Sequence, residues 1–383
     1  MTERLHIAMV ALDFHRQGGS EGRTGHLVDA LVEAGHEVHL LGARILGRWD
    51  PRIFSHVIPV PPRPKWLETL AFLSGAGRFV AKERWDVVHN QIRPYLPGIV
   101  TVGGGCHRFY LERVLPEEQG RLRAWAKRVS PLHRILLGLE RQRYRVEGGT
   151  WVIANSRLNR DGILAFYPLP EARIRVVYNG VDSGRFAPEN AGRFRAAVRR
   201  DLNLTAEDLV LLFVGSNFRR KGLPLVLESL AMGEAGRRMR LVVVGGKESP
   251  HWTRRVTGLG FSGRVRFVGQ VADPERYYAA ADIFVLPTHF DPFANATLEA
   301  MAAGLPVVTT PSNGVAEIIT PGLDGFVLED SRDAGGLEKA LAELTDGERR
   351  RAVGAAARAT ASRFSWAATA EATLETYRAL LGK

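Results

Sequence analysis

Two carboxylates stand eight residues apart in the segment that holds the most chemistry in this sequence. Asp291 lies in a loop after the apolar run 283–286, and Glu299 lies inside a helix that we expect to begin near Ala294 and to end at Gly304. The pair brackets a helix N-terminus, whose unpaired backbone amides attract anions. A carboxylate also accepts paired hydrogen bonds from the hydroxyls of a sugar or a ribose. The alternative is structural, with Asp291 as a helix cap and Glu299 as a surface acid.

A second candidate site is a run of three cations after another apolar stretch. Arg219, Arg220 and Lys221 follow the run 210–214, in a loop that begins at Gly215 and ends at Gly222. Three cations are costly to hold at the end of a buried strand unless an anion lies among them, and together they can stabilise the charge of a diphosphate without a metal. The alternative is a solvated turn.

A third candidate is a glycine-rich turn near the N-terminus. Gly18 and Gly19 open the segment GGSEGRTG after the first apolar run, and a helical pattern follows. Glycine lets the backbone approach a phosphate closely, and the helix N-terminus adds positive potential. The segment is not a GxGxxG fingerprint, and no GxxxxGK[ST] motif occurs in the chain, which excludes a P-loop nucleotidase. A flexible turn is the alternative.

These loops belong to a βα pattern that occurs twice. Short β-branched runs without strict polar alternation predict parallel strands covered on both faces by helices, at 6–12, 37–41, 87–90, 99–102, 151–155 and 175–178, and then at 210–214, 240–244, 265–268, 283–286, 307–310 and 325–328. We therefore predict an α/β protein of two doubly wound Rossmann-like domains, residues 1–180 and 181–383, facing across a cleft. A final helix at about 362–381 either caps its own domain or crosses back to the first.

One segment, at about 113–147, breaks this pattern with two amphipathic helices. Apolar residues recur at helical spacing, first at Leu122, Trp125, Ala126 and Val129, and then at Leu132, Ile135, Leu136 and Leu139. From Arg113 to Arg145 there are nine Lys or Arg and three Glu. Two interpretations are open: a packed helical insertion with solvated arginines, or a membrane-surface patch that includes Trp125, Leu132, Ile135 and Leu136.

The motifs together resemble a known family. The Asp291–Glu299 block, with its continuation EAMAAGLPVV, resembles the E-x7-E signature of retaining glycosyltransferases of family 4, which have the GT-B fold. GGSEGRTGHLVDALVEAGHEVHLL, VIANSRL, RVVYNGVDSGRF and FVGSNFRRKG extend the resemblance over nearly the whole chain. Within the family the sequence is most similar to lipopolysaccharide core glucosyltransferases, through FVGSNFRRKG, DPFANATLEAMAAGLPVVTT and RPYLPG…GGGCHR.

The resemblance implies a role for each matching residue. Arg220 and Lys221 would hold the donor diphosphate, with Gly18 and Gly19 closing on it from the other domain. Glu299 would bind the ribose, and Asp291, which stands where the family usually has Glu, would bind the hydroxyls of the transferred sugar. The other expected residues are the backbone amides of Phe293, Ala294, Asn295, Ala296 and Thr297 around the sugar and phosphate, Gln270 and Val271 beside the base, and His107 as an active-site histidine. His107 could instead be a structural loop residue.

The implied reaction moves a hexose from a nucleotide sugar to a hydroxyl with retention of configuration. The resemblance favours glucose from UDP-glucose and an inner-core heptose of lipopolysaccharide as acceptor, with no cofactor besides the donor. The family is metal-independent, and the chain has no Asp-x-Asp triplet for a metal-dependent transferase. No carboxylate is convincingly placed as a nucleophile, so we favour a front-face mechanism in which the departing phosphate helps to deprotonate the acceptor. Open alternatives are another family 4 glycosyltransferase, a nucleotide-sugar 2-epimerase, or a non-enzyme that binds membranes or nucleic acid.

Charge and composition indicate where the protein works and what it binds. The chain has 383 residues with 52 Lys and Arg against 41 Asp and Glu, a net charge of +11. Residues 1–180 carry net +9 and residues 181–383 net +2, so donor binding does not explain the excess. No aromatic-basic motif or zinc spacing supports nucleic-acid binding, and no metal ligand set is expected. The only cysteine, Cys106, and the lack of a signal peptide favour the cytoplasm, with peripheral attachment to anionic lipid on the inner face of the membrane.

Overall fold

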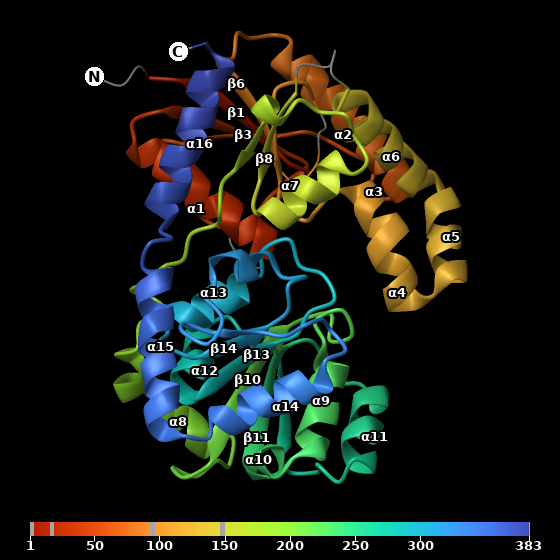
Figure 1. Ribbon diagram of the computed structural model, residues 1–383. Helices are drawn as coiled ribbons and strands as arrows, with labels where there is room; N and C mark the ends of the chain where they lie inside the picture. Colours follow the sequence, from red (N-terminus) through yellow and green to blue (C-terminus); the bar gives the residue numbers. More distant parts are fainter. Residues whose placement is uncertain (1–3, 16–18, 92, 94–95, 146–149, 383) are drawn as a thin grey trace. The chain divides into compact units, whose positions relative to one another are not determined.

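The computed structural model describes residues 4–15, 19–91, 93, 96–145 and 150–382, and the chain divides into two compact units (Figure 1). The first unit comprises Met1–Gly180 together with Trp366–Lys383, and the second comprises Val181–Ser365. Each unit is built around its own parallel sheet, as the buried apolar runs require, because such strands need helices on both faces.

The sheet of the first unit has seven parallel strands in the order β5-β3-β1-β6-β7-β8-β9. The strands are β1 (His6–Val10), β3 (Glu37–Gly42), β5 (Phe54–Val57), β6 (Val87–Gln91), β7 (Ile99–Val102), β8 (Trp151–Ala154) and β9 (Ile174–Val176). Two short strands, β2 (Asp13–Phe14) and β4 (Arg44–Ile45), pair separately. The order reverses direction beside β1, which is the doubly wound topology.

Helices cover both faces of this sheet. One face packs against α1 (Gly19–Glu33) and α16 (Trp366–Leu380), and the apolar cluster there includes Leu31, Met9 and Tyr377. The other face packs against α2 (Lys65–Val80), whose Phe72 and Ala76 are buried with Val10. A further helix, α7 (Arg157–Leu164), follows β8.

The last helix of the chain, α16, lies beside α1 in the first unit (Figure 1). Its Tyr377 hydroxyl lies 2.6 Å from Nδ1 of the buried His89, and its Thr369 hydroxyl donates a 2.9 Å hydrogen bond to the Tyr178 carbonyl. The ring of Trp366 stacks on His26 of α1. The segment from Trp366 onward is therefore part of the first unit's core, although it follows the second unit in the sequence.

A run of helices follows β7 in the first unit. It comprises α3 (His107–Phe109), a π-helical turn (Tyr110–Val114), α4 (Leu115–Gln119), α5 (Arg121–Val129) and α6 (Pro131–Arg143). Ser130 separates α5 from α6, and Pro131 is the first residue of α6, a position that suits proline because its missing N–H costs nothing there.

The second unit has six parallel strands in the order β12-β11-β10-β13-β14-β15. The strands are β10 (Leu209–Gly215), β11 (Met239–Gly245), β12 (Val265–Gly269), β13 (Ile283–Leu286), β14 (Val307–Thr309) and β15 (Phe326–Val327). The helices are α8 (Asn190–Asp201), α9 (Leu223–Met232), α10 (Glu234–Arg238), α11 (Pro250–Gly258), α12 (Glu275–Ala280), α13 (Asn295–Ala302), α14 (Ala334–Glu343) and α15 (Gly347–Ala361). The loops after β10 and β13 leave the same edge of the sheet because these two strands are neighbours.

The predicted fold class is confirmed. Each of the twelve predicted strands is present, with ends that agree within about two residues. The prediction missed β2, β4 and β5. The first two have only two residues each, and β5 is an edge strand whose side chains are largely exposed, so its sequence FSHV carries no buried apolar run.

Candidate active site

The three-cation loop after β10 is fixed to the loop after β13. The backbone carbonyl of Arg220 accepts hydrogen bonds from the amide of His289 at 2.8 Å and from the hydroxyl of Thr288 at 3.0 Å. Gly222 has φ of +86°, and a Cβ atom there would lie 2.0 Å from the carbonyl oxygen of Pro287. Only glycine allows this close approach, so the backbone of the cation loop is held against the segment that leads to Asp291.

Lys221 and Asp291 form an ion pair between these two loops. The Lys221 ammonium contacts Oδ2 of Asp291, and the two side chains are only 12% and 13% exposed. The other carboxylate oxygen, Oδ1, accepts a 3.1 Å hydrogen bond from the Phe293 amide. The structure thus brings together two residues that the sequence assigned to separate groups of the donor, and the positive charge of Lys221 is partly balanced before any ligand binds.

Asn313 is the residue that organises the Asp291 loop, and the sequence analysis missed it. The side chain is fully buried. Its Oδ1 accepts from the amides of Ala294 and Val315 at 3.1 and 3.2 Å, and its Nδ2 donates to the hydroxyls of Thr297 and Thr309 at 3.0 Å each. The loop backbone closes the same arrangement, because the Gly314 amide donates to the Asp291 carbonyl at 2.9 Å. In the sequence, only the Ser-Asn-Gly tripeptide at this position indicated a turn.

The N-terminus of α13 is less open than the sequence analysis expected. Phe293 and Ala294 donate their amides to Asp291 and Asn313, and the Thr297 amide donates to the Ala294 carbonyl at 2.9 Å. Three of the five amides assigned to a ligand are therefore engaged within the protein. Asn295 and Ala296, both half-buried, stand at the first turn of the helix.

Glu299 lies in the second turn of α13 and is held by Tyr278. The buried Tyr278 hydroxyl donates a 2.8 Å hydrogen bond to Oε2 of Glu299, and it lies 3.2 Å from the carbonyl of Ala296. Burial raises the pKa of Glu299, an effect that the hydrogen bond from Tyr278 and the charge of Arg185 oppose. One carboxylate oxygen is thereby oriented by the protein, which suits a group that must present the other to a hydroxyl.

The remaining predicted donor residues lie after a strand, at the start of a helix or outside the described part of the chain. Gln270 is exposed and Val271 half-buried directly after β12, whose last residue, Gly269, has φ of +83°. Gly19 is the first residue of α1. Gly18 lies outside the described residues.

His107 begins α3, and it pairs with a second histidine. Its Nε2 lies 2.9 Å from Nδ1 of His133 on α6, and the two rings stack. Burial, helped by the charge of Arg93, lowers the pKa of His107 to about 3, so the imidazole is neutral at pH 7. The backbone amides of His107 and Arg108 donate to the buried carboxyl group of Glu140, whose pKa is raised by burial.

The glycine loop before His107 adjoins a buried cation that the sequence analysis did not single out. Arg23 of α1 is 5% exposed, and a Cβ atom at Gly103 would lie 2.8 Å from its guanidinium. A side chain at position 103 would therefore displace Arg23. No motif signalled this contact, because Arg23 lies on α1 and Gly103 lies in the loop after β7, far apart in the sequence.

The apolar face of the helical run differs in part from the predicted membrane patch. Trp125 is 62% exposed, but Leu136 is only 4% exposed and belongs to the protein interior, so its assignment to the patch was wrong. Leu132 and Ile135 are half-buried. Leu122 and Val129, which share the face of Trp125 on α5, are 78% and 48% exposed. We call Leu122, Trp125 and Val129 the α5 patch.

Exposed cations surround the α5 patch, namely Arg121, Arg123 and Arg128, of which Arg128 pairs with Glu112 at 3.4 Å. Glu118 and Glu140, two of the three acids between Arg113 and Arg145, are buried. A hollow of about 420 Å³ is lined by Trp125, Arg128, Val129, Arg134 and Leu137, so cations and apolar groups meet in it. Among the described residues, no helix is long and apolar enough to cross a membrane.

Comparisons with known proteins identify a family. The model described as "Glycosyltransferase Family 4" matches residues 17–185, and "Glycosyl transferases group 1" matches residues 194–360. The chain is 32% identical over 321 residues to D-inositol 3-phosphate glycosyltransferase 2 of Catenulispora acidiphila, covering 80% of this chain and 68% of that one. It is 31% identical over 333 residues to the D-inositol 3-phosphate glycosyltransferase of Thermobispora bispora, covering 83% and 71%.

Two solved structures share the fold over nearly the whole chain. WaaG, a glycosyltransferase involved in lipopolysaccharide biosynthesis, has a TM-score of 0.82 at 22% identity, covering 98% of this chain and 100% of that one. HepE of Anabaena in complex with UDP-glucose has a TM-score of 0.72 at 18% identity, covering 98% and 100%. At 22% and 18% identity, these two structures support the fold of this chain and nothing further.

Proposed function

We propose, on the premise that this chain belongs to the group 1 and family 4 glycosyltransferases with the GT-B fold, that it moves glucose from UDP-glucose onto a glycolipid. The acceptor that we propose is an inner-core heptose of lipopolysaccharide. The observation that carries the proposal is the Lys221–Asp291 pair, held between the loops after β10 and β13 next to the N-terminus of α13.

The pair supplies what hexosyl transfer needs at two positions. Lys221 and Arg220 offer cations to the departing diphosphate, where negative charge develops in the transition state. Asp291 offers carboxylate oxygens to the hydroxyls of the transferred sugar. Because the Lys221 ammonium has three N–H groups and only one carboxylate partner among the described residues, it can bind a phosphate oxygen while still holding Asp291 in place.

The proposed reaction retains the anomeric configuration and uses no metal. The bond between the anomeric carbon and the phosphate oxygen breaks as the acceptor oxygen bonds to the same face of that carbon, and the acceptor proton passes to the departing phosphate. Glu299, oriented by Tyr278, would hold the ribose of the donor. The residues Gln270 and Val271 would border the base.

His107 has a restricted role in this proposal. Its imidazole is neutral at pH 7, since burial lowers its pKa to about 3, and it is paired with His133. A neutral imidazole can exchange hydrogen bonds with a sugar hydroxyl, but it cannot act as a resting cation for the phosphate.

The α5 patch supports a lipid-linked acceptor. Exposed Trp125 and Leu122 lie among cations, and the adjoining hollow combines Arg128 and Arg134 with apolar side chains. Such a surface suits peripheral binding to an anionic membrane, because apolar burial and electrostatic attraction add. We propose that the protein works at the cytoplasmic face of the membrane.

A donor panel tests the proposed function. The purified protein is incubated with UDP-glucose, UDP-galactose, UDP-N-acetylglucosamine or GDP-mannose, and nucleotide release is measured with and without heptose-terminated core lipid, in the presence of a metal chelator. The proposal expects UDP release only with UDP-glucose and lipid together. Release with another donor would overturn the glucose assignment, and formation of an epimer without acceptor would favour a 2-epimerase.

Transfer to an inositol phosphate is a second candidate function. Two relatives with about 30% identity over most of this chain are named D-inositol 3-phosphate glycosyltransferases. The same panel with D-inositol 3-phosphate in place of core lipid separates the candidates. The α5 patch favours the lipid, because a small soluble acceptor needs no membrane contact.

A further inference from the structure

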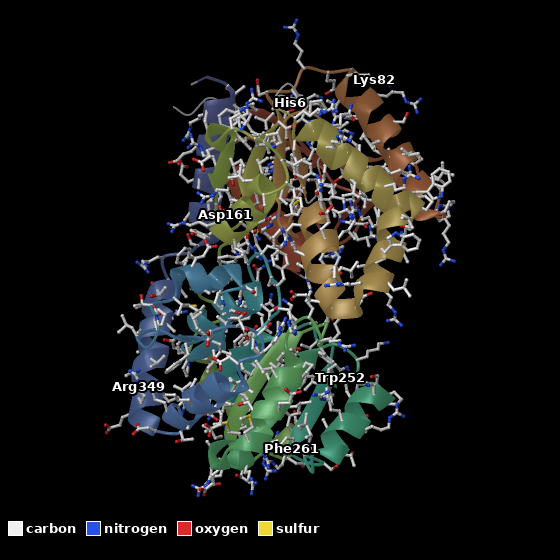
Figure 2. All side chains as sticks on the ribbon, turned by 45° about the vertical axis from the view of Figure 1, so that its right-hand side comes forward. His6, Lys82, Asp161, Trp252, Phe261 and Arg349 are labelled. Carbon is white, nitrogen blue, oxygen red and sulfur yellow. The ribbon has the colours of Figure 1, made fainter. Side chains whose placement is uncertain are left out.

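Three residues that belong to no predicted site meet at the amino end of the first unit's sheet. His6 is the first residue of β1 and Glu37 the first residue of β3, and these two residues are register partners. His39 follows Glu37 by two positions, so both side chains leave β3 on the same face of the sheet. Figure 2 labels His6 among the side chains of this unit. The cluster lies at the opposite end of the strands from the N-terminus of α1 and from α3, which begins at His107.

The ligand atoms of these side chains form a nearly regular triangle. His6 Nε2 and His39 Nε2 are 3.3 Å apart, His39 Nε2 lies 3.1 Å from Glu37 Oε1, and His6 Nε2 lies 3.5 Å from the same oxygen. Zinc bonds of about 2.0–2.1 Å in a tetrahedron require ligand atoms about 3.3 Å apart. The triangle therefore has the dimensions of one face of a tetrahedral zinc site before any metal is added.

Hydrogen bonds to the outer atoms orient the two imidazoles. His6 Nδ1 lies 2.9 Å from the carbonyl of Arg84, and since a carbonyl only accepts, this nitrogen carries the hydrogen and Nε2 presents a lone pair toward the centre. His39 Nδ1 lies 2.9 Å from Nε2 of His56, which can accept a hydrogen from it when Nε2 of His39 binds a metal. Such outer partners are typical of metal-binding histidines.

The carboxylate is prepared in a similar way. Arg4 donates a 2.7 Å hydrogen bond to Glu37 Oε2, which leaves Oε1 directed to the two imidazoles.

Aromatic rings surround the cluster without closing it. Trp85 stacks on His6 with ring centroids 4.1 Å apart, and Phe54 stacks on His39 at 4.5 Å. The side chains of His6, Glu37 and His39 remain 28%, 31% and 10% exposed, so an ion can reach them from solvent. The rings fix the imidazole planes and lower the local polarity, which strengthens the attraction between a cation and the carboxylate.

We infer that His6, Glu37 and His39 bind a zinc ion, with a water molecule at the fourth position. Two imidazoles and one carboxylate in a tetrahedral arrangement favour Zn²⁺ over Mg²⁺ or Ca²⁺, which prefer oxygen ligands. The ion cross-links β1 to β3 and stabilises the first unit. It takes no part in sugar transfer, so the inference goes beyond the proposed function and does not depend on it.

Zinc binding is measured directly on the full-length protein without an affinity tag. Protein freed of metal by a chelator and then dialysed is titrated with ZnCl₂ in competition with a chromophoric indicator, and its thermal unfolding is recorded. We expect one zinc ion per chain, and a rise of roughly 5–10 °C in the Tm of the first unit when free zinc is 100 times its Kd. Co²⁺ in place of zinc should give the intense visible absorption of tetrahedral cobalt.

Two ligand variants and one control assign the ion to this cluster. His6→Gln and Glu37→Gln alter partly exposed side chains, so both should fold, lose at least tenfold in zinc affinity and abolish the zinc-dependent rise in Tm. His251→Gln changes an exposed histidine of α11 in the second unit and should bind zinc as the unaltered protein does. Absence of zinc binding at micromolar protein, or ligand variants with unchanged affinity, would overturn the inference and leave the cluster as a hydrogen-bonded network alone.

Discussion

Histidine and its charge distinguish the two units of the chain. Of the 11 histidines, only His251 and His289 fall within the second unit, and the other nine lie in the first. Burial lowers the pKa of five histidines in the first unit, which are His36, His56, His89, His107 and His133. The candidate site of the second unit instead contains the Lys221–Asp291 ion pair and Arg220.

This difference predicts which of the two units loses stability when the pH falls. A buried neutral base costs the folded state stability once the unfolded chain can take up a proton that the folded chain refuses. We therefore expect acid to weaken the first unit more than the second, where burial raises the pKa of Glu299 instead of lowering that of a histidine.

The largest expected effect is the acid sensitivity of the first unit. Burial lowers the pKa of both His89 and His107 to about 3, far below the value of about 6.5 in an unfolded chain. Both groups thus contribute stability that is present above pH 6.5 and is lost as the pH falls from there toward 3. Between pH 7 and pH 5 the loss should be about 4 kcal/mol for the two together. Hydrogen exchange measured by mass spectrometry at each pH would report the two units separately, and equal losses would contradict the comparison.

A variant of His89 sharpens this prediction. His89 is fully buried between the hydroxyls of Tyr377 and Thr101, each 2.6 Å away, so it also joins the sheet to α16. His89→Gln keeps hydrogen-bonding capacity and should remove about half of the pH dependence, even if it lowers stability at pH 7. The control is His251→Gln, an exposed histidine whose replacement should leave the slope unchanged.

The next effect concerns the permanent charge of the second unit. Lys221→Ala should lower kcat by on the order of 100-fold, the scale of losing one group that stabilises transition-state charge. The variant also leaves Asp291 without its cation. Lys339→Ala, which removes an exposed lysine of α14, should retain full activity in the same assay with UDP-glucose and core lipid. A Lys221 variant with near-normal turnover would refute the proposed site.

A variant of Asn313 tests whether the Lys221–Asp291 site depends on the hydrogen bonds of this uncharged residue. Asn313→Ala removes four hydrogen bonds and leaves buried amides and hydroxyls unsatisfied, so the second unit should lose about 2 kcal/mol of stability and the transferase much of its activity. Urea denaturation and kcat measure the two effects. Asn190→Ala, which removes one exposed hydrogen bond to the Arg185 carbonyl, should change each only slightly. Unchanged stability in the Asn313 variant would show that the loop is held by other groups.

The sequence predicted the strands and the loops that carry the site because both depend on local patterns. Buried parallel strands are continuous apolar runs, and motifs such as FVGSNFRRKG begin in the last residues of such a run and continue into the loop that follows. Contacts between distant segments leave no such pattern. The pairing of Lys221 with Asp291 joins residues 70 positions apart, and His6 meets His39 across 33 positions. The hydrogen bonds of Asn313 likewise arise only when two loops are placed together.

The error at Leu136 has a different cause. Helical periodicity identifies an apolar face but does not say whether that face meets solvent or protein. On α6 the apolar side chains pack inward, where Glu140 is also buried to bind the amides that open α3. On α5 the face with Leu122, Trp125 and Val129 has no packing partner among the described residues that would remove it from solvent. The same pattern thus has opposite outcomes on adjacent helices.

The smallest expected effect concerns binding of the α5 patch to a membrane surface. Trp125→Ser should weaken binding to vesicles that contain anionic lipid by about fivefold, because the variant loses part of the apolar area that the α5 patch can bury in the membrane. Trp66→Ser is the matched control, since Trp66 of α2 is also exposed, at 37%, but lies outside the patch.

Binding of the unaltered protein should fall as salt rises, since the attraction of the arginines to the surface is screened. If neutral and anionic vesicles bind equally at low salt, the basic excess of the first unit does not serve membrane attachment. The contrast between the units would then rest on the buried histidines and the site charges alone.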